Sequence, residues 1–502
     1  MNGRKAHPFA LLLLLAAITL ASCSGPFSGG NNNHGGAANV SFTLVADTLP
    51  ANPSILSFKV SINGIQLTPT AGPAITLTPA KPIVDLMRLQ SDSAFLGTLT
   101  KVPAGTYTVK VSLAAPASGS TITFFNDTAS SITAGSMTCV SGSVCTATLT
   151  ANGTPTIASF TLTVTSSSNQ GVGLDFNLKN AISLSGGALT VNFNPTSPLL
   201  TAFTLPRQNA NLASGQLDLI EDFTGVVSLS GNNLTVTSPT RGALTALISG
   251  ATVFDQSPAP STLCANPPSN CAAANQIASI DAFLNADGTL SLKEFEPLTA
   301  TQQDLVEGIV YLMSGATQFA MVVSDKMQAA SGSLIGGLNT GDLLTVNISS
   351  SVSPFFVDTK GLAVSSTGLF EGATNTTVMH QGQAIAVHVS AFTAASGTTI
   401  ASATVDAVTL RWSRLIAGLN SSSTTTVNVT AVPSYFGITS ASIFPTQVFT
   451  GTLGADGVTN LDGITDAGSL NSTLPVGVRV LYLDNPTHTA QFPFLAAKIR
   501  QH

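Results

Sequence analysis

The chain has 502 residues, of which only 8% carry a charge, whereas an ordinary soluble domain has roughly 25%. Its formal net charge of −6 is spread thinly and forms no basic patch, which argues against a nucleic-acid partner. Hydrophobic residues make up 44%, enough for several cores, and the many threonine and branched residues between Gly and Pro turns favour strands over helices. At about 100–200 residues per domain, we expect roughly three to five domains.

Residues 1–22 have the order of a secretory signal peptide. The basic residues Arg4 and Lys5 precede an apolar run, Phe9–Leu20, that is shorter than the about 20 residues needed to cross a bilayer. Small residues then precede Cys23, and this segment resembles the signal of bacterial lipoproteins. The resemblance implies cleavage before Cys23, diacylglycerol on its sulfur and acylation of the new amino terminus.

The segment that follows the signal is predicted to be a flexible tether over residues 23–38. It is rich in Gly, Asn and Ser and cannot bury enough apolar surface to fold. Ser24 directly follows Cys23, and the lipoprotein resemblance implies that a residue other than Asp here favours the outer membrane. We therefore expect an outer-membrane lipoprotein, held to the membrane by its lipid and facing either the periplasm or the cell surface.

From Val40 onward the pattern changes to short alternating runs. Phe58–Ile62 and Ile65–Leu67 are separated by Asn63-Gly64, which is a strong signal for a β-hairpin. A Pro-Ala-Gly turn precedes a further alternating run at Tyr107–Val111. Short strands with a turn about every 8–12 residues are typical of a sandwich or barrel.

Several motifs of this region are similar to those of a known family: Asp47-Thr48-Leu49-Pro50, Val84-Asp85-Leu86 with Leu89, Val102–Tyr107 and Leu174–Leu178. They resemble a bacterial domain of unknown function that occurs in exported lipoproteins. The resemblance implies a transthyretin-like β-sandwich over residues 39–205. It brings no catalytic residue with it.

Beyond about residue 215 an apolar-x-Gly-apolar opening recurs at Phe223–Val227, Val306–Val310 and Leu415–Leu419. The units that follow are too long for solenoid turns. They predict three small β-modules at residues 215–298, 304–411 and 412–502, and these resemble the OB-like modules that follow the sandwich in such lipoproteins. The Gly in each opening would permit a sharp bend or a close approach of two backbones. The repeat also makes Thr301–Met313 a strand, although its composition suits a helix equally well.

The predicted fold class is therefore all-β: an N-terminal β-sandwich followed by about three small β-barrel or sandwich modules. If Cys23 is lipidated, four cysteines remain in two close pairs, Cys139 with Cys145 and Cys264 with Cys271. In an exported protein both pairs are predicted to be disulfides. Metal binding is the alternative, but zinc sites favour closer cysteines or nearby histidines.

Two acidic loops are weak candidates for calcium. The stretch Asn285–Phe295 echoes a calcium loop, with Asp287 and Glu294 at ligand positions, but its first position has no oxygen ligand and its flanks are strand-like. A plain hairpin turn is the alternative. The second loop is rich in Gly, and Asp-Gly repeats are usually turns. Its acidic residues are Asp456, Asp462 and Asp466. No cofactor is expected, with calcium left open.

Trp412 is the single tryptophan and lies between Arg411 and Arg414, an arrangement suited to binding a sugar or peptide on a β-face. A core or domain-junction tryptophan is the alternative. The chain contains no HExxH, G-x-S-x-G or S-x-x-K motif. We therefore expect a non-catalytic binding or scaffolding role at the cell envelope, with an envelope glycan or protein as partner. The alternatives are an envelope hydrolase acting on polysaccharide and a passive structural spacer.

Overall fold

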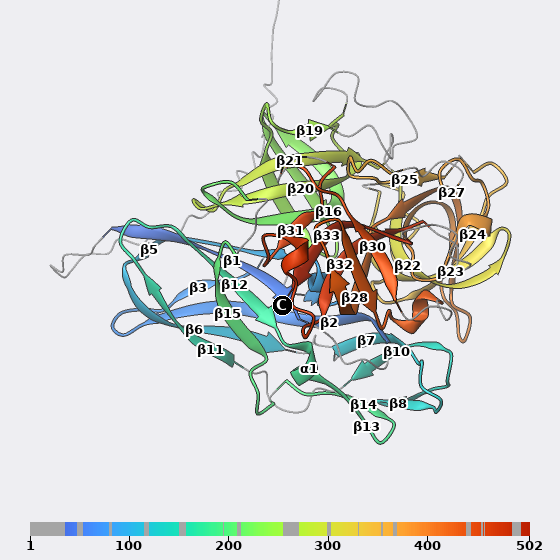
Figure 1. Cartoon of the computed structure of the whole chain (residues 1–502), viewed down its shortest axis with the longest axis horizontal. Coiled ribbons are helices and arrows are strands. Elements are labelled where there is room, and N and C mark those ends of the chain that lie inside the picture. Colours follow the sequence, from blue (N-terminus) through green and yellow to red (C-terminus); the bar gives the residue numbers. More distant parts are fainter. Residues whose placement is uncertain are drawn as a thin grey trace, which may run out of the picture.

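The computed structural model describes residues 36–501 apart from a set of short segments. The segments outside the description are 48–53, 80–82, 115–119, 150–156, 194, 208–211, 255–270, 299–302, 330, 353–354, 365–368, 438–442, 453–454, 456 and 484–492. The described chain is nearly all β, as predicted, with an N-terminal sandwich followed by three small barrel-like modules (Figure 1). None of its helices is long and apolar enough to cross a membrane.

The sandwich is built from two main sheets. The first has the order β15-β12-β1-β5, with β1 parallel to β12, and its strands are β1 (Ala37–Ala46), β5 (Ala94–Pro103), β12 (Gln170–Phe176) and β15 (Leu200–Leu205). The second has the order β10-β7-β2-β6-β11, with two short strands added to β2. Its strands are β2 (Ser54–Pro69), β3 (Ile75–Leu77), β4 (Ile83–Asp85), β6 (Gly105–Ala114), β7 (Ser120–Phe125), β10 (Val144–Leu149) and β11 (Ile157–Val164).

Alternation of apolar residues along β1 and β2 explains the core between these sheets. Phe42 and Leu44 of β1, and Phe58 and Val60 of β2, are all fully buried in one hydrophobic cluster. Strand β1 begins at Ala37, two residues inside the predicted tether. A small third sheet and two short helical turns complete this part of the chain. They are β8 (Ile132–Ala134), β9 (Met137–Cys139), β13 (Ile182–Ser185), β14 (Ala188–Val191), α1 (Leu178–Ala181) and η1 (Arg88–Gln90).

Three modules of the same topology follow the sandwich. In each one the first strand lies between the second and the fifth, and the third strand pairs in parallel with the sixth, which closes a five-stranded barrel. The short fourth strand lies parallel to the sixth on its other edge. The chain therefore folds the same way three times, as the recurring glycine motif suggested.

The strands of the modules are as follows. Module 1 contains β16 (Gln216–Ser230), β17 (Asn233–Ser238), β18 (Gly242–Leu247), β19 (Val253–Phe254), β20 (Ile277–Asn285) and β21 (Leu290–Pro297). Module 2 contains β22 (Leu305–Gly315), β23 (Gln318–Met327), β24 (Leu343–Ile348), β25 (Phe356–Val357), η2 (Thr376–Val378), β26 (Ala384–Thr393) and β27 (Ala401–Arg411). Module 3 contains β28 (Ser413–Ser422), β29 (Thr426–Thr430), η3 (Ser434–Phe436), β30 (Phe444–Val448), β31 (Asn460–Asp462), η4 (Ala467–Ser469), β32 (Val476–Tyr482) and β33 (Phe494–Gln501). The strand assigned to the ambiguous segment Thr301–Met313 is confirmed by β22.

The repeated glycine lies where the first strand of each module crosses closely over the second. A Cβ atom added to Gly225 would lie 2.5 Å from the carbonyl oxygen of Thr237, and one added to Gly308 would lie 2.6 Å from that of Val322. At Gly418 the equivalent approach is 2.7 Å, to a threonine hydroxyl. Close backbone approach is thus confirmed as the reason for glycine at Gly225 and Gly308, whereas at Gly418 the close neighbour is a side chain.

Replacing Gly308 by Ala should lower the free energy of unfolding by about 1–3 kcal/mol, because the new methyl group would collide with the backbone of β23. Unfolding in urea, followed through the fluorescence of Trp412, would measure the loss. Gly337→Ala is the matched control, since nothing lies within 4 Å of the Cβ atom added there. Equal stability of the two variants would contradict the steric explanation.

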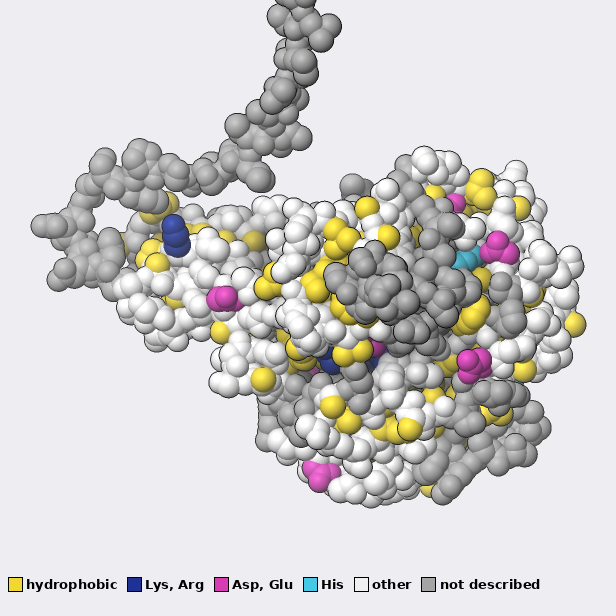
Figure 2. Space-filling view, turned by 90° about the horizontal axis from the view of Figure 1, so that it is seen from above, with side chains coloured by type: hydrophobic (Ala, Val, Ile, Leu, Met, Phe, Trp, Pro, Cys, Tyr) yellow, Lys and Arg dark blue, Asp and Glu magenta, His cyan; other side chains and the backbone are white. Residues whose placement is uncertain are grey.

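The surface is mostly neutral. On the part of this face that Figure 2 colours by side-chain type, nearly all groups are white or hydrophobic, and only a few scattered charged side chains are visible. Many of the charged residues are instead buried at the junction of the sandwich and the three modules.

Candidate binding site: a buried charge network and a cationic pocket

The ends of the short fourth strand and of the sixth strand carry charged side chains into the interior. In module 2, Asp358 directly follows β25 and lies 2.8 Å from Arg411 at the end of β27. In module 3, the equivalent residues Asp462 and Arg500 lie 2.6 Å apart. Module 1 has Glu296 at the place of these two arginines. Modules 2 and 3 therefore each contain an equivalent buried Asp–Arg ion pair, whereas module 1 has an acid at the position of the arginine.

These residues belong to a larger set, here called the charge network, whose side chains are at most 15% exposed and pair with one another within 4 Å. Its members are Arg88, Asp92, Glu221, Asp222, Asp281, Glu296, Glu307, Asp325, Asp358, Lys360, Arg411, Arg414, Asp462, Arg479, Lys498 and Arg500.

The charges of the network are divided unequally among the modules. Module 1 contributes only acids, and module 3 contributes mainly bases. Glu221 of module 1 thus lies 3.1 Å from Arg479 and 2.6 Å from Lys498 of module 3. Lys360 of module 2 lies 3.1 Å from Asp281 of module 1. Such complementary charges favour one arrangement of three similar barrels over the others.

The sandwich joins the network through η1 and the residues after it. Arg88 lies 3.3 Å from Asp325 of module 2. Asp92 accepts a hydrogen bond of 3.0 Å from Nε of Arg414, and its backbone oxygen accepts one of 2.8 Å from Arg500. The network therefore connects all four folded units of the chain.

The surroundings of each carboxyl group decide its pKa. Burial alone would raise the pKa of Asp92, but Arg414 and Arg479 hold it well below its usual range. Arg500 and Lys498 do the same for the pKa of Asp462 against the effect of burial. In contrast, burial and the neighbouring Asp358 raise the pKa of Glu296 well above its usual range.

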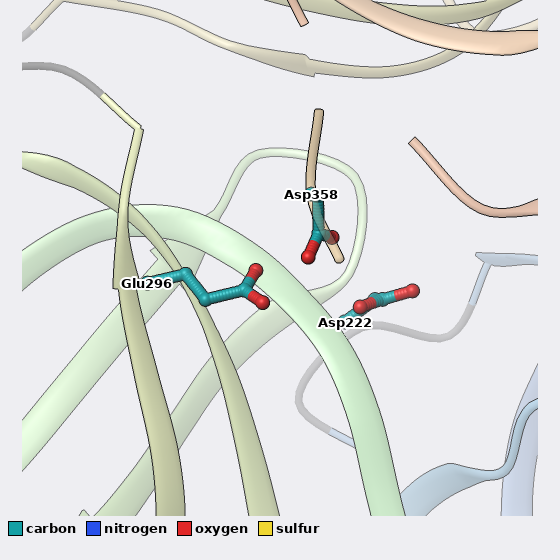
Figure 3. Close-up of side chains that lie close together, drawn as sticks. All are labelled: Asp222, Glu296 and Asp358. Atoms are coloured by element: carbon teal, nitrogen blue, oxygen red, sulfur yellow. The ribbon is translucent and has the colours of Figure 1, made fainter. Parts of the chain in front are cut away.

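Three of these carboxyl groups, Asp222, Glu296 and Asp358, converge as metal ligands would, with oxygen atoms within 4.8 Å of one another (Figure 3). Two side-chain cations already lie among them. Nζ of Lys360 is 3.0 Å from Asp222 and 3.8 Å from Glu296, and Nη1 of Arg411 is 3.2 Å from Glu296. The adjoining cavity beside Lys360 has a volume of only about 30 Å³. The ammonium and guanidinium groups therefore supply the positive charge that the acids require.

The structure does not bring the predicted calcium ligands together. Asp287 forms the hairpin turn between β20 and β21, where its carboxylate accepts hydrogen bonds from the backbone and hydroxyl of Thr289 at 2.9 and 2.6 Å. Glu294 is buried further along β21, 3.7 Å from Lys293. In the second loop Asp462 pairs with Arg500, whereas Asp466 caps η4 and Asp456 lies outside the described residues.

The prediction of a binding platform at Trp412 is wrong. Its side chain is 1% exposed and packs in the core of module 2 together with Leu481 and Leu495 of module 3. It is a junction residue, so no ligand can stack on it from solvent.

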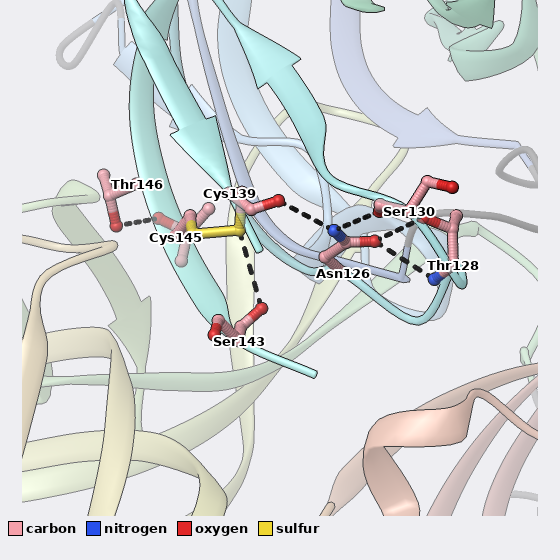
Figure 4. Close-up of a disulfide and its surroundings, with 8 residues drawn as sticks. Asn126, Thr128, Ser130, Cys139, Ser143, Cys145 and Thr146 are labelled. Atoms are coloured by element: carbon pink, nitrogen blue, oxygen red, sulfur yellow. Dashed lines mark hydrogen bonds between the residues drawn. A yellow bond between two sulfur atoms is a disulfide. The ribbon is translucent and has the colours of Figure 1, made fainter. Parts of the chain in front are cut away.

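The disulfide between Cys139 and Cys145 is confirmed, with its Cα atoms 5.9 Å apart (Figure 4). The buried amide of Asn126 donates to the carbonyl oxygens of Cys139 and Ser130, both at 2.9 Å, and so organises the loop beside it. Cys271 is fully buried, but Cys264 lies outside the described residues, and the second disulfide stays a prediction. The lipidation site Cys23 also lies outside them.

Arg88 also borders a pocket of about 580 Å³ between the sandwich, module 1 and module 2. This volume is in the about 300–1,000 Å³ range typical of small-molecule sites. Its polar lining includes Lys59, Arg241 and Lys326 together with Asp85. The sequence analysis missed these residues because they come from three units, and no local motif connects them.

Comparisons with protein-family models, with curated proteins and with solved structures found no match for this chain. The resemblance to a lipoprotein domain and to OB-like modules therefore stays a prediction.

Proposed function

We propose that this protein is a lipid-anchored lipoprotein of the outer membrane with a non-catalytic binding or scaffolding role. The observation that carries the binding role is the charge network together with the pocket beside it. The network joins the sandwich to three modules through buried ion pairs, and the pocket opens between the sandwich and two of these modules. Such an arrangement suits a rigid body that presents a preformed site.

The burial of the clustered acids supports binding over catalysis. A polysaccharide hydrolase needs two carboxyl groups beside a cleft that admits the sugar. Glu296 and Asp358 are at most 1% exposed and pair with Arg411. A passive spacer, in turn, has no need of a pocket lined by side chains from three units.

Replacing Cys23 by Ser should release the protein from the membrane, because the lipid that attaches it would be lost. Fractionation of cells would show the unaltered protein with outer-membrane vesicles and the variant in the soluble fraction. Protease treatment of intact cells would then show which side the protein faces. Identical fractionation of the two proteins would overturn the lipid anchor.

The purified Cys23→Ser protein provides the test of the non-catalytic role. We expect no turnover in a panel of envelope polysaccharides. Turnover that survives repurification and disappears on replacing one carboxylate would instead establish the hydrolase.

A further inference from the structure

Three of the cations that line the 580 Å³ pocket differ from those of the charge network. Every base of the network lies within 4 Å of a carboxylate, whereas Lys59, Arg241 and Lys326 have no such partner among the described residues. Lys326 donates only to the backbone carbonyls of Gly336 and Leu338. These cations therefore have no direct ion pair, although Asp342 acts on the pKa values of both lysines and Asp325 on that of Arg241 from a greater distance.

The guanidinium of Arg241 is held at the pocket wall by neutral groups. It stacks 4.5 Å from the ring centre of Phe223 and donates to the backbone oxygen of Asp222. The turn that contains Arg241 is fixed as well, since the hydroxyl of Thr240 donates a hydrogen bond to Asp325. Burial, with the nearby Arg88, lowers the pKa of Arg241 to about 9, although Asp325 and Asp92 oppose the shift.

A fourth cation also points to a missing acceptor. Nε of Arg88 is buried and has no hydrogen-bond partner in the described structure, although its terminal nitrogens contact Asp325 and the backbone oxygen of Asp222. Buried donors of this kind are normally satisfied.

The single acid of the lining does not balance these charges. Asp85 accepts hydrogen bonds from the hydroxyl of Ser57 at 2.6 Å and from the backbone nitrogens of Phe58 and Met87 at 2.9 and 3.1 Å. Both of its oxygens are thus committed to holding β4 and η1 in place. The excess of positive charge in the pocket remains.

Much of the remaining wall is apolar. Phe95 and Leu96 of the sandwich face the pocket together with Ile220, Phe223 and Leu244 of module 1. A small hydrated anion would satisfy the cations and leave this wall exposed to water. Filling the pocket requires a molecule with both an acidic and an apolar part.

We propose that this pocket binds an amphipathic anion, with a phosphate or carboxylate head among Lys59, Arg241 and Lys326 and an apolar body against Phe95, Phe223 and Leu244. The head replaces the absent carboxylates through charge-assisted hydrogen bonds. The body buries apolar surface on both sides. This assignment rests on the binding role proposed above and gives it a ligand class.

Isothermal titration calorimetry on the Cys23→Ser protein, with probes below their micelle concentrations, tests the assignment. Dodecyl phosphate or dodecanoate should bind saturably at one site. Dodecanol, which lacks the charge, and inorganic phosphate, which lacks the chain, should each bind at least about tenfold more weakly. Equal affinity for dodecanol would overturn the need for an anion, and equal affinity for inorganic phosphate would overturn the apolar part.

Two charge-removing variants test where the acidic head of the ligand binds. Arg241→Gln and Lys59→Gln should each weaken binding of the dodecyl anion about tenfold and leave the response to dodecanol unchanged. Lys110→Gln removes the same charge from an exposed position on β6 of the sandwich and should change nothing. If all three variants bind the anion alike, the pocket is not the site.

The outcomes separate this assignment from the role on which it rests. Weak binding of every dodecyl probe would overturn the ligand class, while Cys23-dependent attachment and the absence of turnover would still support the binding role. Hydrolysis of a polysaccharide would overturn the role itself, whatever the pocket binds.

Discussion

Replacing Asp92 by Asn should lower the free energy of unfolding by about 3–5 kcal/mol, because the change leaves buried guanidinium groups without their anion. Asp92 is fully buried, accepts a hydrogen bond of 3.0 Å from Arg414 and lies 3.5 Å from Nε of Arg479. It is also the acid through which the sandwich reaches module 3. Urea unfolding followed by the fluorescence of the buried Trp412 would measure the loss.

The pH dependence follows from the depressed pKa of Asp92. A carboxyl group with a folded-state pKa below its unfolded value of about 3.9 adds stability that is complete above the unfolded value and lost as the pH falls through the folded one. The parent protein should therefore lose stability in acid more steeply than Asp92→Asn.

Asp287→Asn is the matched control for this change. It alters the same atoms in an exposed hairpin turn, where Thr289 supplies the hydrogen bonds. If Asp92→Asn were as stable as this control, the network would contribute nothing to the stability of the fold.

The features that could be predicted from the sequence depend on residues that lie close together in the chain. The alternation along β1 and β2 predicts strands, although the structure buries both faces of β1, and the glycine of each module opening signals a steric constraint that acts between neighbouring strands. The loop from Cys139 to Cys145 closes over six residues. Each of these features is decided within a short stretch of chain.

The charge network could not be found in this way, because its partners are distant in sequence. Asp92 and Arg414 are 322 residues apart. In β21 the acids Glu294 and Glu296 flank the buried Phe295, and acids alternating with an apolar residue usually face solvent. Only the docking of three barrels makes this face an interior one.

The low overall charge was nevertheless a signal. In a chain with 8% charged residues, two of the three closing strands end in paired charges, as Glu294-Phe295-Glu296 and Lys498-Ile499-Arg500. One pair is acidic and the other basic, but they do not pair with each other: Glu296 pairs with Arg411 of module 2, and Lys498 with Glu221 on the first strand of module 1. The acidic loop residues were misleading for a related reason. Asp462 resembles a calcium ligand in sequence, but its partner is Arg500 on the neighbouring strand.

Replacing Lys360 by Met should destabilise the protein more at pH 8 than at pH 5. Nζ of Lys360 lies 3.0 Å from Asp222 and 3.1 Å from Asp281. Burial raises the pKa of Asp281 to about 7 even though Lys360 opposes the shift. Without the ammonium group the folded-state pKa of Asp281 should rise further.

A raised folded-state pKa gives a pH dependence of stability opposite to that described for Asp92. Between the unfolded value of about 3.9 and the raised folded value, the folded state of the variant holds protons that the unfolded state has released, so stability falls as the pH rises. At pH 5 Asp281 stays protonated and the loss should be small. At pH 8 it must ionise without a partner, which costs about 3–5 kcal/mol. Urea unfolding at the two pH values would measure this difference.

Two controls separate charge from packing. Lys179→Met makes the same substitution at an exposed site and should show no such pH dependence. An equal loss at both pH values in Lys360→Met would mean that the side chain acts through its packing alone.

If the charge is what matters, the variant leaves Asp222, Glu296 and Asp358 within 4.8 Å of one another without the ammonium group of Lys360. Added Ca²⁺ should then stabilise Lys360→Met and not the parent, because in the parent Lys360 already occupies the place that a cation would take.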